Sequence, residues 1–197
     1  TIAHGLSQAP EVIFQKIIAT SDKDYYQLID EQTKIWSPNK KILIDEKYVL
    51  EKWGITPQNF CTARCFAGDQ SDGIKGVKGA GLKVMLRRFP DLGVCKFLSH
   101  HDIINEAKDN IQNGSNLKLF ENIIAGQNDI DKNWKLMYLD SAMLSADQIK
   151  RINFQLDNKE PEMNKMDLYR IINREGLNTF DIHSFFISIK SSLRNII

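Results

Sequence analysis

Two pairs of aspartates are the residues of this sequence best suited to chemistry. Asp22 and Asp24 stand two positions apart, and Asp69 and Asp72 stand three positions apart. Mg²⁺ prefers oxygen ligands, and two ions about 3.5–4 Å apart need carboxylates contributed by separate parts of a chain. In phosphodiester hydrolysis one ion activates the attacking water and the other stabilises the leaving oxygen. We therefore expect these four aspartates to be catalytic metal ligands.

Each pair also has a structural explanation. Ser21 and Asp24 are spaced almost like a capping box, in which side chains satisfy the first backbone amides of a helix. Asp72 followed by Gly73 is a common turn sequence. The presence of two acidic clusters in one chain favours the metal site over either explanation taken alone.

A basic, glycine-rich segment directly follows the second pair. No acidic residue occurs from Gly73 to Pro90. Glycine amides and lysines attract phosphate oxygens, and a turn of this kind reads no base edges, so it predicts duplex binding without sequence preference. The candidate DNA-binding residues are Lys75, Gly76, Val77, Lys78, Gly79, Ala80 and Gly81 in the turn, with Lys83 and Arg87 on the helix that follows.

Simpler explanations of the same segment stay open. A turn between two helices needs glycines for its own geometry. Lys83 and Arg87, four residues apart, also fit a solvated helix face. A Walker A loop is excluded, because no Ser or Thr follows the lysine beyond the last glycine.

A strand must position the first acidic pair. Residues 12–20 are rich in β-branched side chains and predict a strand buried on both faces, as in a parallel sheet. The first pair would then lie just beyond its carboxyl end, where open α/β sheets collect ligands. A helix is expected to start at Tyr25, and short strands are expected at 34–36 and 41–44.

Helices frame the second pair. Asp45 is a capping residue for a helix that ends at Gly54, and Thr56–Pro57 begins another helix that ends at Gly68. After the glycine turn, a short helix is expected over residues 82–89.

The rest of the chain predicts helices without a distinctive motif. Helical periodicity covers residues 101–112, 117–125 and 146–156. With the strands near the start, this pattern predicts an α/β fold that continues into a helical C-terminal region.

Composition excludes several classes of protein. Hydrophobic residues make up 42% and charged residues 26% of the 197 residues, which is typical of a globular protein. No apolar run approaches the roughly 20 residues that a membrane helix needs. The net charge of +1 says nothing about partners. We expect a reducing cytoplasm, with Cys61, Cys65 and Cys95 as thiols.

Other candidate metal sites fail on spacing. His4, His100, His101 and His183 lack zinc-ligand spacing and an obvious catalytic partner. Residues 129–133 imitate part of a calcium loop, but Trp134 stands where that loop needs glycine.

The residues quoted above resemble a known family. Ser-Asp-Lys-Asp-Tyr-Tyr-Gln-Leu at 21–28 and Gly-Asp-Gln-Ser-Asp-Gly-Ile-Lys-Gly-Val-Lys-Gly-Ala-Gly at 68–81 resemble the 5′-nucleases, or flap endonucleases. This family includes bacteriophage 5′–3′ exonucleases, RNase H-like phage nucleases and the 5′-nuclease domain of DNA polymerase I. The resemblance covers roughly residues 12–98.

The resemblance implies both a fold and an activity. Residues 1–45 would be the remaining part of a PIN-like α/β metal-binding core, 46–98 a helix–three-turn–helix (helix-hairpin-helix) element, and 99–197 a helical C-terminal region. The first motif implies Asp22 and Asp24 as Mg²⁺ ligands and the second implies Asp69 and Asp72, with Mn²⁺ as a substitute and, in some members, K⁺ at the hairpin turn. The implied substrates are nicked or branched duplex DNA with 5′ flaps, and RNA–DNA hybrids at RNA primers, in replication.

The chain also departs from the family pattern. Members carry an earlier part with further acids and a helical arch that threads the flap, and neither occurs here. We expect a separate N-terminal nuclease segment to complete the metal site. The rival hypotheses are a non-catalytic duplex-DNA-binding module and a nuclease for structured RNA.

Overall fold

The computed structural model describes residues 15–94, 96–158, 164–177 and 179–194. The chain forms two compact units, residues 1–145 and residues 146–197. The predicted boundaries at 45/46 and 98/99 both fall within the first unit. The start of the predicted strand, at residues 12–14, and Cys95 lie outside the described residues.

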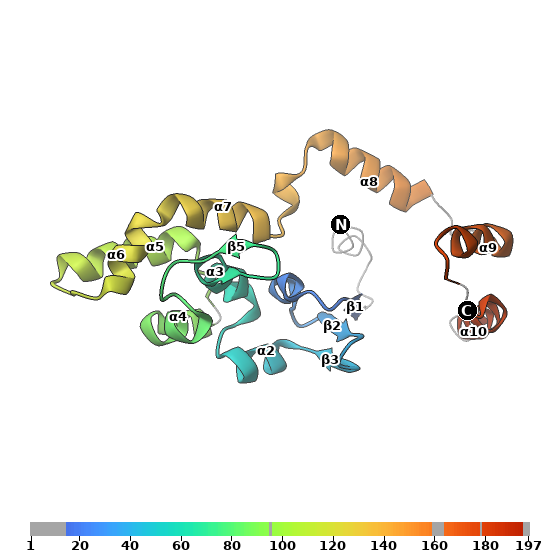
Figure 1. Ribbon diagram of the computed structural model, residues 1–197, viewed down its shortest axis with the longest axis horizontal. Coiled ribbons are helices and arrows are strands. Elements are labelled where there is room, and N and C mark those ends of the chain that lie inside the picture. The colour runs from blue at the N-terminus through green and yellow to red at the C-terminus, as the bar shows by residue number, and fades with distance from the viewer. Residues whose placement is uncertain (1–14, 95, 159–163, 178, 195–197) are drawn as a thin grey trace. The chain divides into compact units, whose positions relative to one another are not determined.

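A three-stranded sheet opens the first unit. β1 (Lys16–Ala19) pairs in parallel with β2 (Thr33–Ser37), which pairs antiparallel with β3 (Ile42–Ile44) (Figure 1). The two short strands confirm the prediction for 34–36 and 41–44. The prediction that this strand is buried on both faces is wrong for the described residues of β1. Exposure alternates along the strand, and Ile17 is 56% exposed.

The segment after β1 is a 3₁₀-helix, η1 (Lys23–Leu28), which begins two residues before the helix start expected at Tyr25. Asp22, not Ser21, is its cap: the Asp22 carboxylate accepts a hydrogen bond from the Asp24 amide at 2.9 Å. Tyr26 is buried and its ring lies 5.2 Å from that of Phe60. This contact attaches the short helix to the core.

Helices α2 (Glu46–Trp53) and α3 (Pro57–Ala67) follow the predicted signals. The Asp45 carboxylate caps α2, and Gly54 ends it in the left-handed conformation, with φ of 69°. Thr56 stands at the start of α3, but its hydroxyl donates to the carbonyls of Leu92 and Val94 instead of capping the helix. Almost all of α3 is buried, so this helix is the central element of the first unit.

A small hairpin and a loop join α3 to the next helix. β4 (Gly68–Asp69) pairs antiparallel with β5 (Ile74–Lys75), and α4 (Leu82–Arg88) and the 3₁₀-helix η2 (Pro90–Gly93) follow. The predicted helix over 82–89 is thus confirmed to within one residue.

Three further helices and a 3₁₀-turn complete the first unit: α5 (His100–Gln112), α6 (Lys118–Ala125), α7 (Gln127–Met137) and η3 (Ser141–Met143). Helix α7 packs against α3, and α6 packs against α5 (Figure 1). The side-chain amide of Asn133 on α7 donates to the backbone carbonyls of Cys65 and Lys75, both at 2.9 Å. These bonds connect α7 to the end of α3 and to β5.

Helices are the regular secondary structure of the second unit over its described residues. It consists of α8 (Ala146–Asn158), α9 (Lys165–Arg174) and α10 (Ile182–Arg194). Among the described helices of both units, none is sufficiently long and apolar to cross a membrane.

Candidate metal and nucleic-acid site

The first acidic pair lies just beyond the carboxyl end of β1, as predicted. The Asp22 amide donates to the Thr20 hydroxyl at 3.1 Å, and the Asp22 side chain caps η1. Asp22 is therefore exposed, whereas Asp24 is turned towards α3 and is partly buried. The two members of the pair point into different surroundings.

The second acidic pair lies on the β4–β5 hairpin. Asp69 ends β4, and its carboxylate accepts hydrogen bonds from the Ser71 amide at 2.9 Å and from the Ser71 hydroxyl at 2.5 Å. Asp72 lies in the exposed turn next to Gly73, whose φ is 70°. The turn explanation of this sequence is therefore confirmed, and it leaves a metal role open.

The two pairs meet around one hollow, here called the acidic hollow. Its volume is about 250 Å³, and its lining residues are Ser21, Asp22, Lys23, Asp69, Ser71 and Asp72. Three of the four predicted metal ligands thus line the same space. Asp24 is not part of the lining, although it is close enough for its charge to interact with those of the other three.

Arg64 is the residue of this site that the sequence reasoning missed. Its side chain is 6% exposed and forms ion pairs with Asp24, at 2.5 Å, and with Asp69. The contact with Asp24 lacks hydrogen-bond geometry, whereas the contact with Asp69 is also a hydrogen bond. A lone charged residue in the apolar run of α3, five positions before Asp69, was the available signal, since buried arginines are rare unless paired.

The pKa values of Asp24 and Asp69, the two carboxyls paired with Arg64, shift in opposite directions. Burial raises the pKa of Asp24, Arg64 opposes this shift, and the charges of Asp22, Asp69 and Asp72 add to it. The hydrogen bond from the Ser71 hydroxyl lowers the pKa of Asp69, with further lowering from the Ser71 amide, Arg64 and Lys23. A cation placed between the four acids would therefore remove like-charge repulsion that Asp24 now experiences.

The donor set of the hollow fits a hard divalent cation. Its carboxylates offer oxygen ligands, and Asp22 and Asp72 are exposed. Four acidic side chains face Arg64 and Lys23, which leaves two negative charges uncompensated. One Mg²⁺ ion would balance them, whereas a second ion would need further acids.

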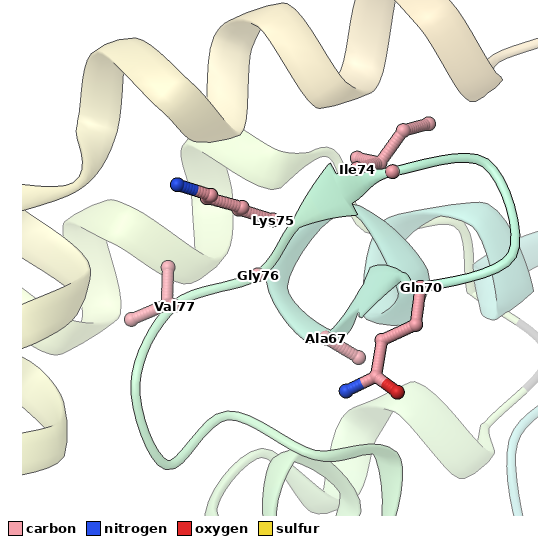
Figure 2. Close-up of a pocket in the computed structure, with 7 residues that line it drawn as sticks. Ala67, Gln70, Ile74, Lys75, Gly76 and Val77 are labelled. Carbon is pink, nitrogen blue, oxygen red and sulfur yellow. The ribbon is translucent and has the colours of Figure 1, made fainter.

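The predicted DNA-binding turn follows the hairpin as an exposed loop, residues 75–81, here called the basic loop. A shallow pocket of about 510 Å³ runs along its start and is lined by Ala67, Gln70, Gly73, Ile74, Lys75, Gly76 and Val77 (Figure 2). The backbone amide of Val77 donates to the Phe66 carbonyl at 2.7 Å, and the side-chain amide of Asn122 donates to the Lys78 carbonyl at 3.0 Å. The middle of the loop is thus held through its own backbone groups, on one side by the backbone of α3 and on the other by a side chain of α6.

The glycines of the basic loop have different roles. A Cβ on Gly76 would lie 2.1 Å from the carbonyl oxygen of Ala67, so this glycine permits close packing of two backbone segments. Gly79 adopts φ of 86°, which favours glycine in its own right. A Cβ on Gly81 would meet nothing within 4 Å. Of these three, Gly81 is the one that neither packing nor φ explains.

The basic side chains around the loop are exposed. Lys75, Lys78, Lys83 and Arg87 all face solvent, and no carboxylate of the described residues forms an ion pair with them. Ala80, in contrast, is buried. The positive charges are therefore available to a ligand, whereas Ala80 is part of the core.

Sequence relatives were found among curated proteins, although no family model matches. The chain is 32% identical over 124 residues to DNA polymerase I of Lactococcus lactis subsp. lactis, which covers 61% of the chain and 13% of that protein. It is also 32% identical over 95 residues to a 5′-3′ exonuclease of Buchnera aphidicola, covering 47% of the chain and 32% of the relative. The relatives found in this way are named DNA polymerase I and 5′-3′ exonuclease. The chain spans well under half the length of these relatives.

Solved structures show the same fold. T5 5′-exonuclease with bound zinc matches 64% of the chain and 44% of its own length, with a TM-score of 0.52 and 19% identity. The T5 D15 flap endonuclease, solved as a pseudo-enzyme-product complex with DNA and metal ions, matches 64% of the chain and 43% of its own length, with the same TM-score. These matches support the predicted mixed α/β, largely helical fold.

Proposed function

We propose that the chain is part of a metal-dependent 5′-nuclease that cleaves DNA at 5′ flaps, nicks or RNA primers during replication. One observation carries the proposal: a candidate metal ligand, Asp69, and a candidate phosphate-binding residue, Lys75, lie on the two paired strands of one hairpin. Asp69 pairs with Ile74, and Gly68 pairs with Lys75. Asp69, Ser71 and Asp72 line the acidic hollow, and Gln70 and Gly73 of the same turn line the pocket at the start of the basic loop, so a phosphate bound there would lie next to the hollow.

In this proposal Asp22, Asp24, Asp69 and Asp72 would hold Mg²⁺ or Mn²⁺, and Asp24 would do so in place of its ion pair with Arg64. The bound ion would polarise the scissile phosphate and lower the pKa of a water molecule. Arg64 keeps Asp24 and Asp69 oriented towards each other. Lys75, Lys78 and Lys83 neutralise duplex phosphates, and the exposed glycine amides approach them closely.

The finer assignment of the fold belongs to the same proposal. Residues 46–98 would form a helix–three-turn–helix grip on the duplex, with K⁺ at the basic loop. Residues 1–45 would be part of a PIN-like core, and residues 99–197 a helical C-terminal region. The charge balance of the acidic hollow supports one ion from this chain, so a second ion would take ligands from a separate N-terminal nuclease segment.

The decisive experiment uses an end-labelled 5′-flap duplex with Mg²⁺ or EDTA, and measures cleavage and binding together. We expect salt-sensitive duplex binding and, in the complete enzyme, Mg²⁺-dependent cleavage that Asp69→Asn/Asp72→Asn lowers at least about 1000-fold, the order that loss of a catalytic group costs. Duplex affinity should stay within about threefold. Unchanged cleavage in the double variant would exclude the metal assignment.

A second candidate function is a non-catalytic duplex-binding module, and Arg64 is the observation that favours it. A buried arginine that pairs with two of the four acids is what a site without a metal needs. This alternative predicts the same salt-sensitive binding with no response to Mg²⁺. Isothermal titration with Mg²⁺, in wild type and in Asp69→Asn/Asp72→Asn, separates the two. RNA and DNA flaps compared in the same assay test the RNA substrate.

A further inference from the structure

A second group of metal-binding side chains lies apart from the acidic hollow, between α5 and α7. His100 and His101 begin α5, and Asp131 lies on the first half of α7. One ligand atom from each of these residues lies within 4.8 Å of the other two. Sequence spacing did not reveal this group, because the third member is 30 positions from the second.

The start of α5 fixes the two histidines. The Ser99 hydroxyl accepts from the Asp102 amide and the Asp102 carboxylate accepts from the Ser99 amide, so a complete capping box sets His100 as the first helical residue. The ring of His100 stacks on that of Trp134, with centroids 4.6 Å apart, and lies 4.0 Å from that of His101.

Asp131 is held from the other side. Its helix is anchored by Asn133, whose amide binds the carbonyls of Cys65 and Lys75. The Asp131 carboxylate oxygen lies 3.1 Å from Nε2 of His100. Two ligands that share one ion at about 2.0–2.2 Å are separated by a similar distance. The contact serves as a hydrogen bond without an ion and as an edge of a coordination shell with one.

His100 is also incompletely satisfied. Its side chain is 8% exposed, and its Nδ1 atom has no hydrogen-bond partner. Burial lowers the pKa of His100, and the neighbouring His101 lowers it further against the opposing effect of Asp131.

We propose that His100, His101 and Asp131 form a site for a divalent transition metal, with Zn²⁺ as the best match. Two imidazoles and one carboxylate suit Zn²⁺, whereas Mg²⁺ prefers oxygen ligands alone, as in the acidic hollow. His101 is exposed and Asp131 partly so, which leaves the remaining coordination positions to solvent. The ion would connect α5 to the helix that holds the end of α3 and β5.

The test measures Zn²⁺ binding to the full chain in the presence of excess Mg²⁺, by equilibrium dialysis with metal analysis. We expect one Zn²⁺ per chain, retained in Asp69→Asn/Asp72→Asn. His101→Ala and Asp131→Asn should each weaken binding about 100-fold or more, the upper range for loss of a supporting group at a metal site. The matched controls are Asp129→Asn on the same helix and the exposed His183→Ala, which should change nothing.

Trp134 supplies an independent readout, because it stacks on a proposed ligand. Co²⁺ should quench the fluorescence of Trp134 in wild type and much less in His101→Ala. Comparison with Trp134→Phe gives the part of the total tryptophan fluorescence that comes from Trp134. Zn²⁺ should also raise the Tm of wild type and leave that of Asp131→Asn unchanged. Equal Zn²⁺ affinity in wild type and both ligand variants, or no Zn²⁺ bound beside Mg²⁺, would overturn the proposal. Neither result would alter the proposed nuclease function.

Discussion

The acidic hollow and the basic loop adjoin on one hairpin, but their charges are arranged differently. Asp24 and Asp69 are largely removed from solvent and paired with a buried arginine. Lys75 and Lys78 are exposed, and no described carboxylate pairs with them. The acids are thus part of the folded framework, whereas the lysines contribute little to it.

This difference indicates where binding energy comes from in each region. Exposed charges lose little solvation on folding, so they remain available to a polyanion. Buried acids must be compensated in the free protein, and Arg64 provides that compensation. A metal ion must therefore compete with Arg64 in the hollow, while a phosphate meets no internal competitor at the loop. The predictions below test this comparison, beginning with the largest expected effect.

Replacing Arg64 should affect stability most. Arg64→Gln leaves Asp24 and Asp69 without compensation, and breaking a buried ion pair costs about 3–5 kcal/mol. The free energy of unfolding is measured by urea titration with tryptophan fluorescence, which reports the first unit because Trp36, Trp53 and Trp134 all lie in it.

Lys47→Gln is the control for Arg64→Gln, because Lys47 forms an exposed pair with Glu51 at 3.8 Å. It should cost less than about 1 kcal/mol. If the hollow binds Mg²⁺, added Mg²⁺ should stabilise Arg64→Gln more than wild type. Equal effects of the two substitutions would show that the buried pair is not needed by the fold.

Two glycine substitutions separate packing from phosphate binding within the loop. Gly76→Ala places a Cβ against the Ala67 carbonyl oxygen and should cost about 2–3 kcal/mol of stability, as overpacking does. Gly81 has φ of −59° and open space around it, so Gly81→Ala should leave stability within about 0.5 kcal/mol. It should instead weaken duplex binding in a gel-shift titration, since a methyl group hinders approach of a phosphate. Unchanged affinity in Gly81→Ala would remove this glycine from the proposed interface.

The lysines of the loop should determine the salt dependence of binding. Each phosphate contact adds about 0.9 to the slope of log affinity against log salt on B-DNA. Lys75→Gln/Lys78→Gln should therefore lower the slope by about 1.8 without changing the urea midpoint. Lys132→Gln, at an exposed pair with Asp129, is the matched control. A double variant with the wild-type slope would place the duplex elsewhere.

Local signals in the sequence were sufficient for α2, for the boundaries of α3 and for the turn at Asp72 and Gly73, because capping residues and glycines act within a few positions. Long-range contacts could not be read in this way. The pairing of Arg64 with Asp24 spans 40 positions, and the approach of Asp131 to His100 spans 31. The burial of β1 was misjudged for the same reason, since an apolar strand does not show which of its faces the rest of the chain covers.

The smallest expected effect concerns Cys61, which lies on α3 one turn before Arg64. Burial raises its pKa from an ordinary value near 9 to about 12, and the charge of Asp24 adds to this shift. Between these two pH values the unfolded chain loses a proton that the folded chain keeps. The free energy of unfolding should therefore fall as pH rises, by at most about 1.4 kcal/mol per pH unit for this thiol.

Cys61→Ala isolates that contribution, because it removes the titrating group. It should lower stability by a constant amount at pH values below 9 and flatten the decline above them, as measured by urea unfolding across the interval. Asp24→Asn should leave the onset of the decline near pH 9, which the unfolded thiol sets, and should end the decline at a lower pH, since removing the negative charge lets the folded thiol ionise more easily and narrows the gap between the two pKa values. Parallel curves for wild type and Cys61→Ala would show that the thiol does not titrate differently in the folded protein. The charge of Asp24 would then have no effect on the Cys61 thiol. The acidic hollow would influence α3 only through the ion pairs with Arg64.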